Sequence, residues 1–538
     1  MLTGDELVFS ARRGPGTPQI EGHVRDTGLG PITVDGRPVV SAVYFCVRDT
    51  AWGTVTPTRL TTALSGSSAP GQYKFSCTYE AESVDLRTVG EIEAFPDGSI
   101  TFSCQTTAGA PLRCARIGWV VILPLSYVGR TYETTGSAGD AHGVIPDIVA
   151  PQLIQDETTF PMIGPFAAIR FSEAGGAPVL DVSDDGTSLE LEDQRNWADA
   201  SFKIYQPPLS LVTECTARRG ETLEHQVRLL VHPGEVSDAV RVLAVPDPAP
   251  SERPSPEAES LLPAIGLLLR PDQYRDAGPD ADAFAELLKS IAPGYLRLDA
   301  GVAHPIRPND FTVRLLRASG LPAELDIHEI GLDSAGLALL ADALEDVSIL
   351  RVHVLGDEES MPSTRLLPDA RRLLPDVPIL AGPDGWFAGF NRCGALAADW
   401  DGASWGVCPQ VHDFADATIL RSHESVQAVA DTARQLAGPD RMLVASPLIL
   451  KPHKSDQREP QDLGAAWLRM SIECLGQGRI DAVTVAITES TLRTWQKGVP
   501  SPFLTTLRQM CASPTRPACG PDAGARSIPI PGRADAQG

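Results

Sequence analysis

The chain has 538 residues, 43% of them hydrophobic, and a formal net charge of −24. A single hydrophobic core seldom serves so long a chain, so we expect two or three domains. The acidic balance argues against nucleic-acid binding, which requires a basic surface, and no apolar run is long enough to span a membrane.

Residues 1–13 have no apolar segment of the kind found in secretory signals. Ten cysteines are spread along the chain, and none belongs to a CxxC pair or to a Cys/His cluster at zinc spacing. We therefore expect reduced, mostly buried thiols and a cytoplasmic location.

Residues 1–246 predict an N-terminal antiparallel β-sandwich. Runs such as "VVSAVYFCVR", "SITFSCQTT" and "RIGWVVILPL" are strand-like and are separated by Gly, Pro, Asp and Ser, without a long helical period. Residues 247–260 are rich in Pro, Ser and Glu and predict a linker.

Residues 261–512 predict a (β/α)8 TIM-type barrel, because apolar strands alternate there with amphipathic helical stretches. The eight expected strands are 264–270, 295–300, 323–330, 349–355, 377–382, 403–409, 442–450 and 482–487. The remaining residues, 513–538, are rich in Pro and Gly and predict a disordered tail.

Several of these strands end in polar residues, at the face where barrel enzymes place their active sites. The candidate catalytic groups are His412, Asp413, Glu329 and Glu489, and the candidate substrate-binding groups are Gln410, Asn391, Arg297, Asp384, Trp386 and His328. A histidine that accepts a proton from water, together with amides and cations that bind oxygen atoms, is suited to hydrolysis. Each residue alone also fits a solvated loop position or a helix N-cap.

The segment "LELEDQRNWADASFKIY" (189–205) concentrates charges and amides within the expected sandwich. It is either an exposed hairpin with internal ion pairs or a loop that reaches the barrel mouth. In the second interpretation, Arg195 and Asn196 fix the domain interface or contact substrate, and Glu192 belongs to the same set.

Other chemistries have less support in the sequence. There is no GxSxG, Walker or GxGxxG motif, and no HxH or HExxH spacing for a metal, so we expect neither a metal nor another cofactor. Two alternatives stay open. One is a glycoside hydrolase that uses Asp357 or Glu358 with Glu489, and the other is a catalytically inactive carbohydrate-binding protein.

Segments along nearly the whole chain resemble the D-apionate lactonase family, among them "YFCVRDTAWGTVTP", "EDQRNWADASFK", "CPQVHDFADAT" and "VASPLILKP". The resemblance implies an N-terminal β domain, a TIM-type barrel and hydrolysis of a sugar-derived lactone, such as D-apionolactone, to its hydroxy acid. We expect the given sequence to lack the further C-terminal β domain of longer members. The polar positions that match the family are Glu192, Asp193, Arg195, Asn196, Asn391, Gln410 and His412.

In the mechanism that this resemblance implies, His412 activates water, Asp413 or Glu329 assists it, and Gln410, Asn391 and Arg297 bind the lactone oxygens. The partner is a small carbohydrate-derived substrate. The sequence also departs from the family pattern. Asp384 replaces an amide, and Gly389 and Ile487 replace glutamates, which predicts either a different substrate or loss of activity.

Overall fold

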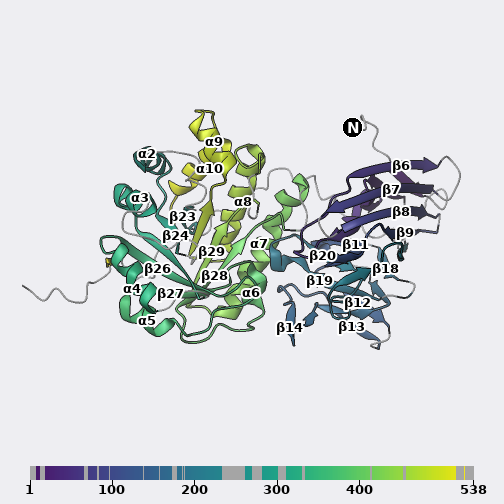
Figure 1. The fold of residues 1–538 in the computed structure, drawn as a ribbon, viewed down its shortest axis with the longest axis horizontal. Coiled ribbons are helices and arrows are strands. Elements are labelled where there is room, and N and C mark those ends of the chain that lie inside the picture. Colours follow the sequence, from purple (N-terminus) through teal and green to yellow (C-terminus); the bar gives the residue numbers. More distant parts are fainter. Residues whose placement is uncertain are drawn as a thin grey trace, which may run out of the picture. The chain divides into compact units, whose positions relative to one another are not determined.

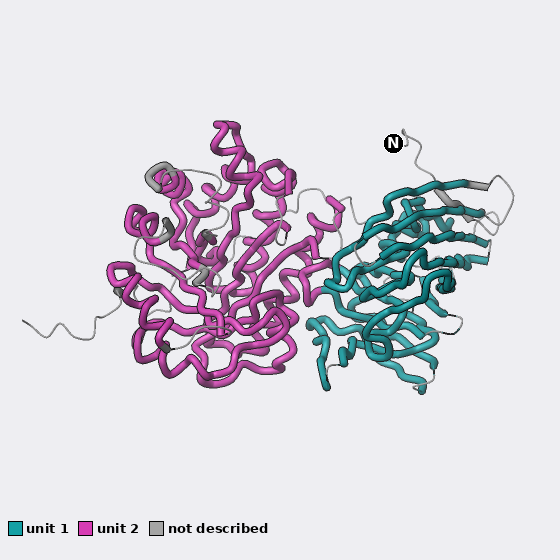
Figure 2. Tube along the Cα trace, in the orientation of Figure 1, with its two compact units in different colours: residues 1–194, 201–254 teal, residues 195–200, 255–538 magenta. Residues whose placement is uncertain are grey.

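The computed structural model describes residues 8–11, 19–65, 71–81, 84–95, 97–136, 139–156, 158–172, 178–184, 186, 188–232, 261–269, 281–300, 311–329, 334–411, 415–451, 456–516 and 526–527. The chain divides into two compact units (Figure 2). One comprises Met1–Gln194 and Ser201–Pro254, and the other comprises Arg195–Ala200 and Ser255–Gly538.

The first unit contains two large antiparallel sheets. One has the order β1 (Val8–Ala11), β2 (Ile20–Arg25), β3 (Gly28–Val34), β5 (Ala42–Arg48), β11 (Arg116–Pro124), β20 (Ser201–Tyr205), β19 (Leu189–Asp193) and β16 (Ile163–Phe166), with β4 (Arg37–Val40) paired to β3. The other has the order β13 (Ala141–Val144), β12 (Thr131–Thr135), β17 (Ala168–Phe171), β18 (Val179–Ser183), β22 (Thr222–His232), β9 (Ser99–Ala108), β8 (Val84–Ala94), β7 (Gly71–Ala81) and β6 (Arg59–Ser65).

Shorter elements complete this unit. They are the strand pairs β10 (Leu112–Cys114) with β21 (Cys215–Ala217) and β14 (Leu153–Gln155) with β15 (Thr158–Phe160), and the 3-10 helices η1 (Leu125–Tyr127) and η2 (Gln194–Trp197).

Aromatic side chains from both large sheets meet in one hydrophobic core. The Trp119 ring on β11 has its centroid 5.6 Å from Phe45, 6.2 Å from Phe75 and 5.5 Å from Phe102. Along β8, buried residues alternate with more exposed ones, as expected for a strand with one face on the core. The predicted β-sandwich is therefore confirmed.

The second unit contains a closed parallel barrel (Figure 1). Its strands are β23 (Ala264–Leu269), β24 (Tyr295–Ala300), β25 (Ala323–His328), β26 (Ser348–Leu355), β27 (Ile379–Gly382), β28 (Gly402–Val407), β29 (Met442–Leu448) and β30 (Ala482–Ala486). Pairing of β23 with β30 and of β25 with β26 completes the ring of eight strands. All eight predicted strands are present, and the predicted TIM-type barrel is confirmed.

Helices lie around the barrel (Figure 1). Within the described residues they are α2 (Ala281–Ile291), α3 (Phe311–Ser319), α4 (Ser334–Ala343), α5 (Leu367–Leu373), α6 (Phe387–Asn391), α7 (Asp416–Ala437), α8 (Asp462–Gln477), α9 (Glu489–Gln496) and α10 (Pro502–Cys511). A two-residue strand, β31 (Arg526–Ser527), pairs antiparallel with β26.

The domain boundaries drawn from the sequence stay predictions. The first compact unit ends at Pro254, and the second continues from Ser255. In the segment predicted as a tail, the Pro514 carbonyl accepts a hydrogen bond from the Leu262 N–H (3.2 Å), and the Arg516 N–H donates to the Leu262 carbonyl (2.8 Å).

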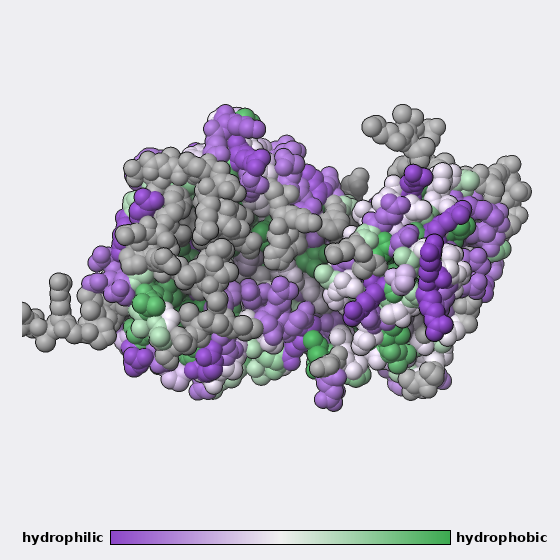
Figure 3. All heavy atoms as spheres, viewed as in Figure 1, coloured by the Kyte–Doolittle hydropathy of each residue, from purple (hydrophilic) through white to green (hydrophobic). Residues whose placement is uncertain are grey.

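Hydrophilic residues form much of the coloured surface in Figure 3, and hydrophobic residues appear there only in small groups. Within the described part of the chain, no helix combines the length and the apolar character needed to cross a membrane.

Candidate active site

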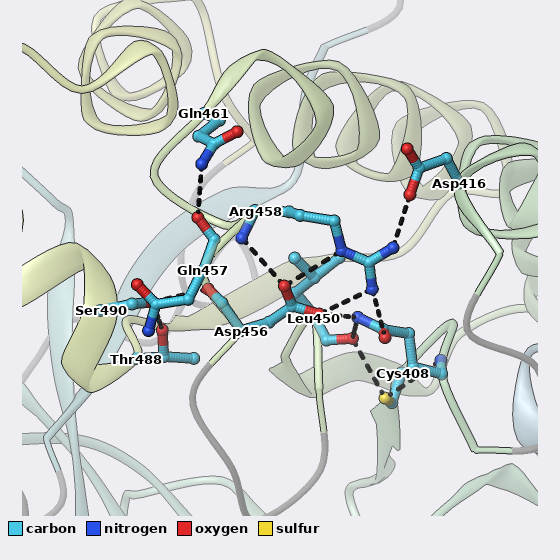
Figure 4. A network of polar contacts seen from close by, with 10 residues as sticks. Cys408, Asp416, Leu450, Asp456, Gln457, Arg458, Gln461, Thr488 and Ser490 are labelled. Atoms are coloured by element: carbon cyan, nitrogen blue, oxygen red, sulfur yellow. Dashed lines mark hydrogen bonds and ion pairs between the residues drawn. The ribbon is translucent and has the colours of Figure 1, made fainter. Parts of the chain in front are cut away.

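Figure 4 shows Asp456 and Arg458, which hold the end of the sixth barrel strand through the side chain of Gln410. Gln410 is 1% exposed. Its Nε2 donates to the Leu450 carbonyl (3.0 Å) and to Asp456 Oδ2 (2.9 Å). Its Oε1 accepts a hydrogen bond from Arg458 Nη2 (2.9 Å). Gln410 therefore ties the end of β28 to the residues that follow β29.

Asp456 and Arg458 form the centre of this network. Arg458 donates to Asp456 through Nη2 (2.8 Å) and Nε (3.1 Å), and Nη1 contacts Asp416 at the start of α7. Burial opposes ionisation of Asp456, but the hydrogen bonds from Arg458 and Gln410 outweigh it and lower the pKa of the Asp456 carboxyl. The hydrogen bond to Asp456 and the nearby Asp416 raise the pKa of Arg458. The pair is therefore ionised at neutral pH.

The same segment reaches the eighth strand through Glu459, a fully buried residue that the sequence analysis missed. Glu459 Oε1 accepts hydrogen bonds from the Thr488 N–H (2.9 Å), Thr488 Oγ1 (2.8 Å) and Thr491 Oγ1 (2.6 Å). Within the described part of the chain, its Oε2 has no hydrogen-bond partner. Burial raises the pKa of Glu459 to about 7. Residues 456–461, which we call the 456–461 segment, thus connect the ends of β28, β29 and β30.

An apolar cluster lies beside Gln410 and consists of residues near the ends of several strands. Cys408, Leu268, Ile449 and Ala486 are buried in it, and the Trp386 ring packs against them. A Cβ added at Gly406 would lie 3.0 Å from the Trp386 ring, so glycine lets this ring approach the strand. Burial raises the pKa of the Cys408 thiol well above its usual value, which makes this thiol a poor nucleophile.

Residues 195–200 belong to the barrel unit although they lie between β19 and β20 in the sequence (Figure 2). Within this unit, Asn391 Nδ2, at the end of α6, donates to Asn196 Oδ1 (2.9 Å). Asn196, Arg195 and Asn391 are each at least nine-tenths buried. The alternative of an exposed hairpin for this segment is therefore wrong.

Glu192 lies on β19 in the first unit and is 3% exposed. Its carboxylate accepts hydrogen bonds from Gln152 and from Gln194 Nε2 (2.6 Å) and forms an ion pair with Lys203 (2.6 Å). These contacts hold β19 to its neighbours, and substrate binding by Glu192 stays a prediction.

Of the other predicted residues, His328 ends β25, Glu329 and Asp384 lie in loops that follow strands, and Glu489 begins α9. His328 Nδ1 is 3.2 Å from Asp384 Oδ2, which brings the ends of β25 and β27 together. Both Glu329 oxygens accept hydrogen bonds from Ser363, one from its N–H (2.7 Å) and one from its hydroxyl.

Glu489, the first residue of α9, contacts Arg493 one turn later, and its side chain is 46% exposed. An exposed ion pair of this spacing is typical of a helix surface.

Arg297 lies inside the barrel, where charged side chains from three neighbouring strands compensate one another. Its Nε donates to Asp326 Oδ2 (2.6 Å), and Glu324 on β25 contacts Arg351 on β26. His353 lies 3.5 Å from Glu324 Oε2 and is fully buried. Burial lowers the pKa of His353 to about 3, so its imidazole is neutral and only weakly basic at neutral pH.

His412 and Asp413 lie outside the described residues. Among those that are described, no group of three or more His, Cys, Asp or Glu side chains could hold a metal ion. The described strand ends thus offer a fixed position at Gln410, an apolar cluster with an indole ring, a buried amide pair and a His–Asp pair. Such a set can bind a polyol through its oxygen atoms and its C–H groups.

Comparisons with known proteins give two family matches. Residues 11–234 match the N-terminal domain of D-apionate lactonase, and residues 265–453 match its TIM barrel domain. The chain is 26% identical over 438 residues to the D-apionate lactonase of Brucella anthropi, an alignment that covers 77% of this chain and 69% of that protein.

Among solved structures, a β-arabinopyranosidase matches at 10% identity with a TM-score of 0.30 and covers 94% of this chain and 85% of that chain. A variant of a GH36 α-galactosidase of Geobacillus stearothermophilus, in complex with raffinose, matches at 10% identity with a TM-score of 0.28, covering 94% of this chain and 87% of that chain. Scores this low support no conclusion about activity.

Proposed function

Because the chain belongs to the D-apionate lactonase family, we propose that it is a hydrolase that opens a sugar-acid lactone, similar to D-apionolactone, to the hydroxy acid. The observation that carries this proposal is that both domains of the family match this chain in the same order.

Lactone hydrolysis needs a base that takes a proton from water, and donors that stabilise the charge developing on the carbonyl oxygen. We assign the base to His412, with Asp413 or Glu329 assisting it. The water oxygen adds to the carbonyl carbon, the ring C–O bond breaks, and the proton held by His412 passes to the leaving alkoxide. The attachment of Gln410, two residues before His412, supports this assignment because catalytic groups need a fixed position.

Substrate binding is assigned to polar residues near the strand ends. Asn391 donates an amide hydrogen bond to Asn196, and amides of this kind match the hydroxyl groups of a sugar acid. Trp386 offers an apolar ring for C–H groups. Arg297 is assigned to a lactone oxygen, with Asp326 holding its guanidinium inside the barrel.

His328 is the main competitor for the role of base, because Asp384 contacts it as an orienting carboxylate would. His353 and Glu459 are less suitable, since both are fully buried. The chain thus offers two histidines whose substitution distinguishes the two assignments.

The test is hydrolysis of D-apionolactone and a panel of aldonolactones, followed by proton release at pH 7 with blanks for spontaneous opening. We expect His412→Ala to lower kcat by about 10²–10⁴-fold, the usual contribution of a general base. His142→Ala, at an exposed position on β13, is the matched control and should keep full activity. If His328→Ala lowers kcat while the His412→Ala protein stays active, the general base is His328 and not His412.

Failure of the folded wild-type protein to turn over any lactone would contradict the proposed function. Thermal stabilisation by the same lactones without turnover would then indicate a binding protein.

A further inference from the structure

Two cysteines of the first unit lie directly opposite each other on neighbouring strands. Cys114 ends β10 and Cys215 begins β21, and the two residues are register partners in this antiparallel pair. Cys114 is fully buried and Cys215 is 8% exposed.

The register places the two residues within the range that a disulfide requires. Directly opposite residues of an antiparallel pair have Cα atoms about 4.5–5.5 Å apart, and disulfides span about 4.4–6.8 Å. The Cys114 thiol donates to the Arg116 carbonyl (3.6 Å) and the Cys215 thiol donates to the Ala115 carbonyl (3.9 Å), so both sulfur atoms lie against residues 115–116. A bond between the sulfur atoms therefore needs little movement of the backbone.

A buried cation lies beside this pair. Arg116 is 7% exposed and donates through Nη1 to the carbonyls of Ala115 (2.6 Å) and Val212 (2.9 Å). Within the described part of the chain, no carboxylate forms an ion pair with Arg116. The neighbouring Cys114 thiol and the charge of Arg116 lower the pKa of Cys215, although burial opposes this. A thiolate at Cys215 would give Arg116 a counter-charge.

Two other buried cysteines of the sandwich lack this arrangement. Cys77 on β7 and Cys104 on β9 are separated by β8, where Cys77 faces Thr88 and Cys104 faces Gly90. Burial raises the pKa of the Cys77 and Cys104 thiols. These two residues serve as an internal control with similar burial and without direct pairing.

We propose that Cys114 and Cys215 form a disulfide when the protein meets a peroxide, a modification site separate from the proposed hydrolysis. The Cys215 thiolate attacks one oxygen of hydrogen peroxide, the O–O bond breaks, and a sulfenic acid and hydroxide form. Cys114 then attacks the Cys215 sulfur and loses its proton, and the sulfenic oxygen leaves as water. Overall, two thiols are oxidised to one disulfide, and one peroxide is reduced to two waters.

The experiment treats the reduced full-length protein with hydrogen peroxide and follows the intact mass, with peptide mapping under non-reducing conditions. We expect a loss of two hydrogen atoms, a peptide that links Cys114 to Cys215, and reversal by dithiothreitol. The loss of two hydrogen atoms should be absent in Cys114→Ala and in Cys215→Ala. It should be unchanged in the double variant Cys77→Ser/Cys104→Ser. Circular dichroism checks that each variant is folded.

A second variant tests the part played by Arg116. Arg116→Gln should slow formation of the link about tenfold, the change expected when the pKa of a thiol rises by one unit. Arg116→Lys should restore part of the rate because it keeps the positive charge. A wild-type protein that forms no link, or whose first link joins other cysteines, would overturn the proposal.

Discussion

Position 389, at the middle of α6, leaves no room for a side chain. A Cβ added at Gly389 would lie 2.6 Å from Pro383 Cβ and 3.2 Å from the carbonyl carbon of Glu359. The glutamate expected here from the family pattern therefore does not fit this backbone unless neighbouring residues move. We predict that Gly389→Ala lowers the free energy of unfolding by about 1–3 kcal/mol, the usual effect of overpacking, as measured by urea denaturation.

A second glycine provides the control for this prediction. Gly476 in α8 has its nearest neighbour, the Leu261 carbonyl oxygen, 3.4 Å from an added Cβ. Gly476→Ala should leave stability unchanged or raise it by up to about 1 kcal/mol, because alanine favours the helix. Equal stability of the two variants would show that Gly389 is not sterically required.

The buried carboxyl of Glu459 predicts that the stability of the protein depends on pH. Burial raises its pKa from 4.5 to about 7, so the folded protein holds this proton more tightly than the unfolded chain does. Its contribution to stability is therefore present below pH 4.5 and is lost as the pH rises to about 7. The Glu459→Gln protein, whose amide does not titrate, should gain about 2–3 kcal/mol relative to wild type between pH 5 and pH 8.

Urea denaturation at several pH values measures this difference. Glu473→Gln, at an exposed position on α8, should change stability by a constant amount over the same range. A constant offset for Glu459→Gln as well would contradict the raised pKa.

At the scale of elements, the 456–461 segment controls the end of β28 through Asp456. Replacing Asp456 by Asn removes the charge that holds Arg458 and weakens the contact to Gln410. We predict that Asp456→Asn lowers kcat for the lactone by about 10–100-fold, since a misplacement of about 1 Å has effects of this size. Asp462→Asn, at an exposed position in the first turn of α8, is the matched control.

Hydrogen exchange gives a readout that does not depend on activity. Amides of residues 403–411 should exchange faster in Asp456→Asn and at the wild-type rate in Asp462→Asn. Faster exchange with unchanged kcat would show that the segment stabilises the strand end without serving catalysis.

The strands of the barrel could be predicted from the sequence, whereas this segment could not. Parallel strands that are buried on both faces appear as continuous apolar runs, such as residues 442–450, and are separated by amphipathic helices. Asp456, Arg458 and Glu459 belong to no periodic pattern, and their partners Gln410 and Thr488 are 29 to 48 residues away in the sequence. Contacts of this kind depend on how loops from different strands meet.

At the scale of the whole molecule, the two domains and their order could be predicted because their hydrophobic periods differ. The contacts between charged residues inside the barrel could not be predicted in this way. Arg297 was predicted from its place on a strand, but its partner Asp326 depends on the register of β24 with β25. A single sequence gives the faces of each strand but not this register, so the compensation of charges inside the barrel emerges only from the structure.

This interior network predicts that the protein loses stability in acid. Burial opposes ionisation of Glu324, but its neighbours His353, Arg351 and Arg297 outweigh it and lower the pKa of the Glu324 carboxyl from 4.5 to about 2. The unfolded chain therefore takes up this proton before the folded protein does. The stability that Glu324 contributes is present above pH 4.5 and is lost as the pH falls to about 2.

Replacing Glu324 by Gln leaves Arg351 inside the barrel without its contact to a carboxylate. We predict that this change lowers the free energy of unfolding at pH 7 by about 3–5 kcal/mol, the usual result of breaking a buried ion pair. The difference from wild type should shrink between pH 4.5 and pH 2.5, because the wild-type protein loses this contribution there while the variant does not. Urea denaturation at pH 7, 4.5 and 2.5 measures it, with the exposed Glu286→Gln as the control. A destabilisation that stays constant down to pH 2.5 would show that the packing of the side chain, and not its charge, holds the barrel interior together.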